Sequence, residues 1–150
     1  MSDIKSPEAR SRNMAAIKGK DTKPEIYLRK KLFKKGLRYR VHSVSVPGHP
    51  DIYSKKYNLA IFVNGCFWHR HEGCKYAYMP KSRIEFWQKK FNTNILRDRE
   101  VYAQLKEKNV RCLIVWECSI KAALRSAETE DRLIDSILAF IESSGSFLEI

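Results

Sequence analysis

The stretch DIYSKKYNLAIFVNG (residues 51–65) places two short apolar runs on either side of the polar segment SKKYN. The segment before it, LRYRVHSVSVPGHP (37–50), alternates in polarity and turns at PGHP. Apolar runs separated by polar turn residues are typical of a hairpin that leads into a buried strand. We therefore predict that Asp51 opens one strand and that NLAIFV (58–63) forms the neighbouring strand.

Helix signals stand on both sides of this hairpin. Thr22 and Glu25 form a capping box in front of an amphipathic run. Ser82 and Glu85 form a second capping box, which predicts a long helix through about residue 108.

The C-terminal part adds a strand and a helix. VRCLIVWEC (110–118) is nearly continuously apolar, as a buried strand is. EDRLIDSILAFIESSG (130–145) has one apolar face, formed by Leu133, Ile134, Ile137, Leu138 and Ile141. Helices interleaved with strands predict an α/β layered fold.

The chain has the size and composition of one domain. Its 150 residues, 43% of them hydrophobic, can build a single core, so we expect one domain over 1–150. SPEARSRNMAAIKGKD (6–21) begins with Ser6 as a candidate N-cap and Pro7 at the first helical position. We expect residues 1–20 to form a flexible N-terminal helical region.

Charge favours nucleic acid as the partner. Lys and Arg number 29 against 17 Asp and Glu, a formal net charge of +12 that suits phosphate backbones. No apolar run approaches the roughly 20 residues of a membrane helix, and the N-terminus lacks the apolar block of a signal peptide. We expect a cytoplasmic protein, in which cysteines are thiols or metal ligands. Composition does not separate a DNA-binding protein from an enzyme.

The segment GCFWHRHEGC (65–74) is dense in metal-ligand residue types. Cys66, His71 and Cys74 lie close together in it, and Cys118 stands just past the end of the predicted C-terminal strand, so they predict a Cys3His zinc site. The alternative is a group of ordinary buried thiols. Cys112 lies inside the apolar strand, and we assign it to the core.

Three residues are candidates for chemistry at a phosphodiester. His69, if His71 turns toward a metal, is free for proton transfer; the alternative is a hydrogen-bonding role in the loop. Asp51 at a strand start can hold Mg²⁺, although an Asp after Pro also forms turns. Glu25 is already explained by helix capping.

Two aromatic pairs, Phe67 with Trp68 and Phe86 with Trp87, lie near basic residues. Large rings beside phosphate-binding side chains can unstack base pairs, and the alternative is core packing. We favour the wedge for Phe67 and Trp68 and leave both readings open for Phe86 and Trp87.

Five separated blocks, in order, resemble the very-short-patch repair (Vsr) DNA mismatch endonucleases. They are RSRNMAAIKGKDT (10–22), PGHPDI (47–52), FVNGCFWHRHEGC (62–74), PKSRIEFWQKKFNTNILRDR (80–99) and LIVWEC (113–118). The resemblance implies a restriction-endonuclease-like fold, a PD-(D/E)xK variant with a central mixed sheet flanked by helices and a structural zinc. It also implies Mg²⁺-dependent nicking of one strand at T:G mismatches that arise from deaminated 5-methylcytosine.

The resemblance also implies roles for residues. Asp51, His69 and Glu25 match catalytic positions, and the zinc ligands match Cys66, His71, Cys74 and Cys118. DNA-contacting positions match Met14, Phe67, Trp68, Trp87 and Asn94. Beside these, we expect backbone contacts from basic side chains of the 82–108 helix, Lys89, Lys90, Arg97 and Arg99.

Two positions depart from the family pattern. Val63 stands where members can carry Thr, so a Mg²⁺ contact there uses the main-chain carbonyl. Asn64 stands where a His assists catalysis, and an amide hydrogen-bonds but does not carry a proton. We therefore expect either that the nicking activity is weaker or that another residue takes over the assisting role of this His.

Two rival functions remain open from sequence. One is a catalytically silent zinc-containing DNA-binding module, and the other is a nuclease for another DNA distortion. The family also implies a MutL-type mismatch-repair protein and a cytosine-5 methyltransferase in the same pathway, and we expect a monomer.

Overall fold

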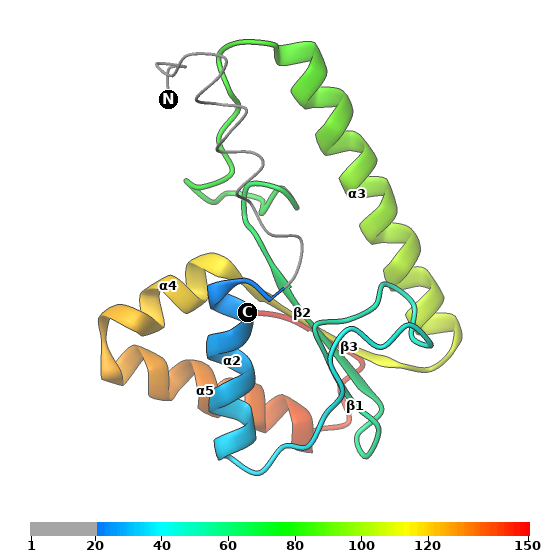
Figure 1. Cartoon of the computed structure of the whole chain (residues 1–150), viewed down its shortest axis with the longest axis vertical. Helices are drawn as coiled ribbons and strands as arrows, with labels where there is room; N and C mark the ends of the chain where they lie inside the picture. Colours follow the sequence, from blue (N-terminus) through cyan, green and yellow to red (C-terminus); the bar gives the residue numbers. More distant parts are fainter. Residues whose placement is uncertain (1–20) are drawn as a thin grey trace.

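The computed structural model describes residues 21–150 and has strands and helices in alternation (Figure 1). The predicted helix and the Met14 contact in residues 1–20 lie outside the described residues. The elements are α2 (Lys23–Lys34), β1 (Ile52–Ser54), β2 (Leu59–Asn64), α3 (Ile84–Glu107), β3 (Arg111–Trp116), α4 (Glu117–Arg125), α5 (Ala127–Glu142) and β4 (Phe147–Glu149). The predicted α/β class is confirmed.

The four strands form one mixed sheet in the order β1-β2-β3-β4. β1 and β2 are the predicted antiparallel hairpin, with Ile52 opposite Ile61. β2 and β3 are parallel, with Asn64 opposite Trp116, and β4 is parallel to β3. Upstream of the hairpin, the alternating segment contributes an isolated bridge between Arg40 and Tyr53.

Helices cover both faces of the sheet. α2, α4 and α5 share one buried cluster with strand residues such as Leu113 and Val115. α3 packs on the opposite face through Leu105, which joins Ile114 in a second cluster. Cys112 belongs to this second cluster, as predicted. Figure 1 shows α3 beginning well away from the sheet and ending beside it.

The first capping prediction is confirmed, and the second helix has its N-cap one residue later than predicted. The Thr22 Oγ1 accepts a hydrogen bond from the Glu25 N–H at 3.4 Å, so α2 begins where the sequence predicts. α3 instead begins after Arg83, which adopts a left-handed conformation with φ of 53°. Arg83 stands at the N-cap position, and its side chain makes no capping hydrogen bond.

The end of the chain holds two elements that we did not predict. α4 begins directly at the end of β3, and β4 adds a short edge strand after α5. The apolar face of α5 is as predicted: Leu133, Ile134, Ile137 and Ile141 are buried, and Leu138 packs against them. Among the helices of residues 21–150, none combines the length and apolarity needed to span a membrane.

Substitution of Leu113 measures how much the core of the sheet contributes to the stability of the fold. Its side chain is fully buried in the central strand β3, so Leu113→Ala should lower the free energy of unfolding by about 2–5 kcal/mol. Urea denaturation measures this change. Leu124 on α4 is 63% exposed, and Leu124→Ala is the control that should change stability by less than about 0.5 kcal/mol. Equal effects of the two substitutions would contradict this account of the core.

Candidate functional site: a cysteine and histidine cluster beside an acidic pocket

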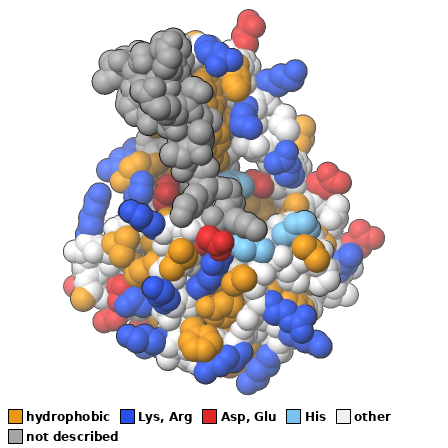
Figure 2. Space-filling model, in the orientation of Figure 1, with side chains coloured by type: hydrophobic (Ala, Val, Ile, Leu, Met, Phe, Trp, Pro, Cys, Tyr) orange, Lys and Arg blue, Asp and Glu red, His pale blue; other side chains and the backbone are white. Residues whose placement is uncertain are grey.

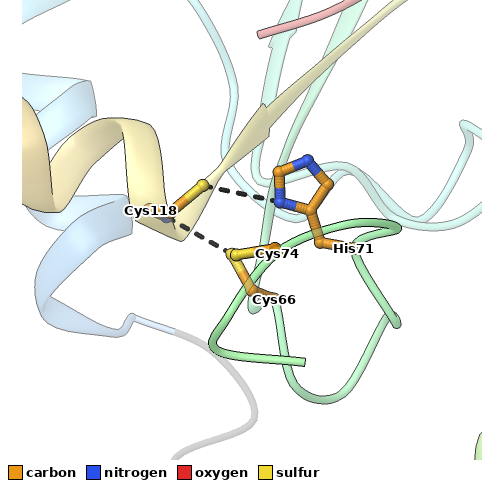
Figure 3. Close-up of side chains that lie close together, drawn as sticks. All are labelled: Cys66, His71, Cys74 and Cys118. Carbon is orange, nitrogen blue, oxygen red and sulfur yellow. Dashed lines mark hydrogen bonds between the residues drawn. The ribbon is translucent and has the colours of Figure 1, made fainter. Parts of the chain in front are cut away.

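The four predicted metal ligands lie together at the carboxyl ends of β2 and β3 (Figure 3). The ligand atoms of Cys66, His71, Cys74 and Cys118 are all within 4.8 Å of one another. The Cys118 Sγ lies 3.5 Å from the His71 Nδ1, and the Cys118 N–H donates to the Cys66 Sγ at 3.4 Å. Three sulfurs and one imidazole nitrogen are a donor set that structural zinc sites use.

The loop that carries three of these ligands is folded by its own backbone. The His71 N–H donates to the Cys66 carbonyl and the Cys74 N–H to the His71 carbonyl. Gly73 between them has φ of +73°, a conformation that glycine adopts without strain. The His71 ring also stacks on Trp116 at 4.2 Å. Glu72 and Gly73 thus form a turn between His71 and Cys74.

Two thiols of this cluster, those of Cys66 and Cys118, are costly to ionise without a cation. Burial raises the pKa of the Cys66 thiol to about 12, and the neighbouring cysteines add to the shift. Burial also raises the pKa of Cys118. A divalent cation would favour the thiolate forms, so the residues present fit a metal.

Asp51 lies in a second, acidic pocket beside β2. Its Oδ2 accepts a hydrogen bond from the Val63 N–H at 2.6 Å, and its side chain is 15% exposed. Burial raises the pKa of Asp51 to about 7, and the Glu25 carboxylate adds to this shift. Two carboxylates thus share one buried site, an arrangement that suits a hard divalent cation with oxygen ligands.

Three further residues complete this pocket, and sequence reasoning missed them all. Arg29 donates to Asp21 and Glu25, and its Nη2 lies 2.9 Å from the His42 Nε2. His42 in turn places its Nδ1 3.9 Å from the Asp51 Oδ1. The spacing of Asp21, Glu25 and Arg29, four residues apart, was a readable helix-face signal. Nothing in the local sequence distinguishes His42.

His69 is held by a carboxylate, Asp98 on α3. The His69 Nδ1 lies 2.7 Å from the Asp98 Oδ2, and both line a cavity of about 710 Å³ that also reaches Cys74. The His69 N–H donates to the Gly65 carbonyl, directly after β2. Within residues 21–150 neither a hydrogen bond nor an ion pair joins His69 to Asp51, although both attach to the same end of β2.

α3 holds the loop after β2 through three side chains spaced four residues apart. The Asn94 Nδ2 donates to the Trp68 carbonyl, and Asp98 pairs with His69. Tyr102 accepts a hydrogen bond from the buried Asn64. Asp98 and Tyr102 were not predicted, although their spacing from Asn94 marks one face of the helix.

The aromatic residues form one cluster with partly exposed rings. Phe67 contacts Trp68 at 5.1 Å and Trp87 at 5.5 Å between ring centroids, and it also packs on Phe91. The Arg70 guanidinium lies 3.9 Å from the centre of the Phe91 ring. Both predicted uses, packing and an exposed wedge, are therefore compatible with the arrangement.

Basic side chains lie next to this aromatic cluster. Lys89 and Arg97 are exposed on α3 and, with Asn94, line a shallow pocket. Figure 2 shows Lys and Arg over much of one face, with histidines near its centre beside acidic side chains. Positive charge thus surrounds a small region that could hold cations.

The mixed sheet flanked by helices and the side chains that could hold a metal ion define the class: an α/β protein with a candidate metal site. A family model described as DNA mismatch endonuclease Vsr matches residues 2–75. The DNA mismatch endonuclease Vsr of Escherichia coli is 38% identical over 150 residues, which is 100% of this chain and 94% of that protein.

Two nicking enzymes are similar over most of the chain. The type II nicking enzyme V.NmeAIP of Neisseria meningitidis is 38% identical over 137 residues, 91% of this chain and 97% of that protein. V.XorIIP of Xanthomonas oryzae pv. oryzae is 40% identical over 120 residues, 80% of this chain and 88% of that protein. The chain belongs to the Vsr family of DNA mismatch endonucleases.

The raised pKa of Asp51 predicts a pH dependence of stability in buffer without added divalent cation. The pKa is about 7 in the folded chain and about 3.9 in the unfolded chain, so folding retains a proton between these values. The free energy of unfolding should therefore fall as pH rises from about 4 to 7. Asp51→Asn should remove this slope and be more stable than wild type at pH 8 by roughly 1–3 kcal/mol.

Urea denaturation of both proteins at pH 5 and pH 8 measures the effect. Asp135 on α5 is exposed, and Asp135→Asn is the control that should keep the wild-type slope. If the free energy of unfolding of Asp51→Asn differs from that of wild type by the same amount at both pH values, the pKa of Asp51 is not raised in the folded chain.

Proposed function

We propose that this chain is a DNA endonuclease that nicks one strand at T:G mismatches arising from deaminated 5-methylcytosine, with Mg²⁺ as its catalytic ion. The observation that carries the proposal is the Asp51 and Glu25 pocket at the same end of β2 as His69, in a member of this endonuclease family. The mixed sheet flanked by helices supports the expected restriction-endonuclease-like fold.

Asp51 and the Val63 carbonyl would hold the Mg²⁺. The bond from the Val63 N–H fixes Asp51 beside that residue, which supports this pairing. An ion held there would supply positive charge to neutralise the scissile phosphate and the charge that develops on the leaving oxygen. Glu25, which contacts both Arg29 and Asp51, would orient a water at this site in addition to its place in α2.

His69 would accept the proton of the attacking water. The His69 Nδ1–H would donate its hydrogen bond to the Asp98 carboxylate. The other ring nitrogen, Nε2, then carries the free lone pair. That nitrogen is the one available as general base. Asp98 acts as a positioning residue, because it fixes the tautomer and the direction of the ring.

Asn64 takes a structural role in this proposal. Its side chain is buried, and its Nδ2 donates to the Tyr102 hydroxyl at 3.3 Å. We therefore assign it to holding β2 against α3, and we assign no proton transfer to it.

DNA recognition would use the aromatic cluster and the basic face of α3. Phe67, Trp68 and Trp87 would enter the base stack, which costs less at a mismatch than at a matched pair. Asn94 would contact the mismatch region, while Lys89 and Arg97 would bind phosphates. The bond from Asn94 to the Trp68 carbonyl supports a shared role. Met14 would add a contact from the N-terminal region.

The proposal also covers the structural metal, the oligomeric state and the pathway of the protein. Cys66, His71, Cys74 and Cys118 would hold a structural Zn²⁺. The protein would act as a cytoplasmic monomer of one domain, in a pathway with a cytosine-5 methyltransferase and a MutL-type repair protein.

His69→Ala should reduce nicking by about 10²–10⁴-fold, because the general base is lost. Binding to the mismatched duplex should change little, since the aromatic and basic residues remain. Nicking and gel-shift assays on T:G and matched duplexes, with and without Mg²⁺, measure both quantities. His49 is exposed away from these contacts, and His49→Ala is the control that should keep full activity.

Other results of these assays would favour a different role for His69 or a different function for the chain. Full activity of the His69→Ala protein would remove His69 from the chemistry. Equal cutting of matched DNA by wild type would favour a nuclease of another specificity. Mismatch binding without any cutting would favour the silent DNA-binding module.

Cys66→Ala should abolish stoichiometric zinc and lower the melting temperature, because a structural metal contributes to folding free energy. Elemental analysis and thermal denaturation measure the two effects. Cys112 is equally buried but lies in the core, so Cys112→Ala should keep the metal. A wild-type chain without zinc, or a Cys66→Ala chain with it, would refute the ligand assignment.

A further inference from the structure

Arg70 joins the two ends of the loop that carries Phe67 and Trp68. Its Nη1 donates to the Phe67 carbonyl and to the Tyr78 carbonyl, both at 3.1 Å. Its Nη2 donates to the Ala77 carbonyl at 2.8 Å. One guanidinium therefore ties the outgoing part of this loop to the part that returns.

The same guanidinium packs against α3. Its central carbon lies 3.9 Å from the centre of the Phe91 ring, and Phe91 is buried. A flat cation on a ring face is attracted by the electrons of the ring. The Phe67 ring packs on both Phe91 and Tyr78, with 5.1 Å between the ring centroids in each pair. The groups that Arg70 holds are thus the ones that support Phe67.

Trp68, the next residue, is held from α3 as well. The Asn94 Nδ2 donates to the Trp68 carbonyl at 3.0 Å. The carbonyls of Phe67 and Trp68 are therefore both fixed by side chains, while the two rings remain partly exposed. An aromatic pair that is fixed at its backbone and open at its rings suits insertion into a base stack.

The backbone of Arg70 is itself in an uncommon conformation, with φ of 53°. Such a conformation persists where surrounding contacts fix it, and the bonds from the Arg70 side chain to three carbonyls do so. Within residues 21–150 these partners are neutral, and no carboxylate pairs with Arg70. A Lys ammonium is a point charge that does not reproduce the flat set of donors that this contact uses.

We propose that Arg70 is a positioning residue for mismatch recognition, which holds Phe67 and Trp68 in the orientation that enters the base stack. Ordering side chains and loops on binding costs entropy, and a loop that is already fixed avoids this cost. The gain applies only where the rings insert, so it favours the mismatched duplex, which is easier to unstack. A matched duplex is bound through its phosphates and gains nothing from it. The inference rests on the proposed function and adds a residue that sets its specificity.

Binding of the full chain to T:G and matched duplexes, measured by fluorescence anisotropy of labelled DNA without divalent cation, tests the inference. Arg70→Lys keeps the charge but loses the flat donor set, so affinity for the T:G duplex should fall about tenfold. Affinity for the matched duplex should stay the same. Arg70→Met should show the same loss at the T:G duplex. Arg125 on α4 is exposed, and Arg125→Lys is the matched control that should keep both affinities.

Hydrogen exchange gives a second readout that needs no DNA. Exchange of the amides in residues 65–79, followed by mass spectrometry, should be faster in Arg70→Lys than in wild type, because the loop is no longer tied at both ends. If Arg70→Lys does not fold, as judged by circular dichroism, Arg70→Gln keeps one donor group and gives the same comparisons.

The outcomes separate this inference from the proposed function. A wild-type preference for T:G in Arg70→Lys would overturn the inference and leave the proposed function in place. A phosphate contact would instead show as a salt dependence that falls by about one unit of log-log slope in Arg70→Met and is restored in Arg70→Lys. This result would also overturn the inference. Equal affinity of wild type for both duplexes would overturn the proposed T:G specificity. Faster exchange in Arg70→Lys would then still support Arg70 as the residue that fixes the loop, and unchanged exchange would overturn that too.

Discussion

The parallel pairing of β2 with β3 is the constraint on which the site depends. Because Asn64 lies opposite Trp116, the residues that follow the two strands meet at one edge of the sheet. Cys66 and Cys118 are brought together in this way despite their distance along the chain. The antiparallel hairpin adds Asp51 at the same edge, through the Val63 N–H. One sheet register therefore sets the positions of both the cysteine and histidine cluster and Asp51.

The loop after β2 makes the two functions of this edge interdependent. His69 lies between Cys66 and His71, so the same few residues carry a candidate base and two metal ligands. α3 holds the other side of this loop through Asn94 and Asp98. The candidate metal ligands and the direction of the His69 ring consequently depend on the packing of the same loop against α3.

Local patterns predicted the local structure well. The Thr22 cap, the 51–65 hairpin and the Cys3His cluster are as expected, because each depends on neighbouring residues or on strand ends. The N-cap of α3 lies at Arg83, one residue after the predicted Ser82, because Arg83 adopts a left-handed conformation before the helix begins. The short strand β4 has too few residues for a pattern of its own, and it forms by pairing with β3. His42 and Asp98 act through contacts between distant segments, which no short motif encodes.

The positions of the three tryptophans have a practical consequence. Trp68 and Trp87 lie in the partly exposed aromatic cluster, while Trp116 is buried and stacks on His71. The tryptophan emission of the unlabelled chain therefore comes from the aromatic cluster and from the ring beside the cysteine loop. Moving Trp68 and Trp87 into a base stack would quench their light, and unfolding of the cysteine loop would shift that of Trp116. The molecule carries its own optical reporter for both events.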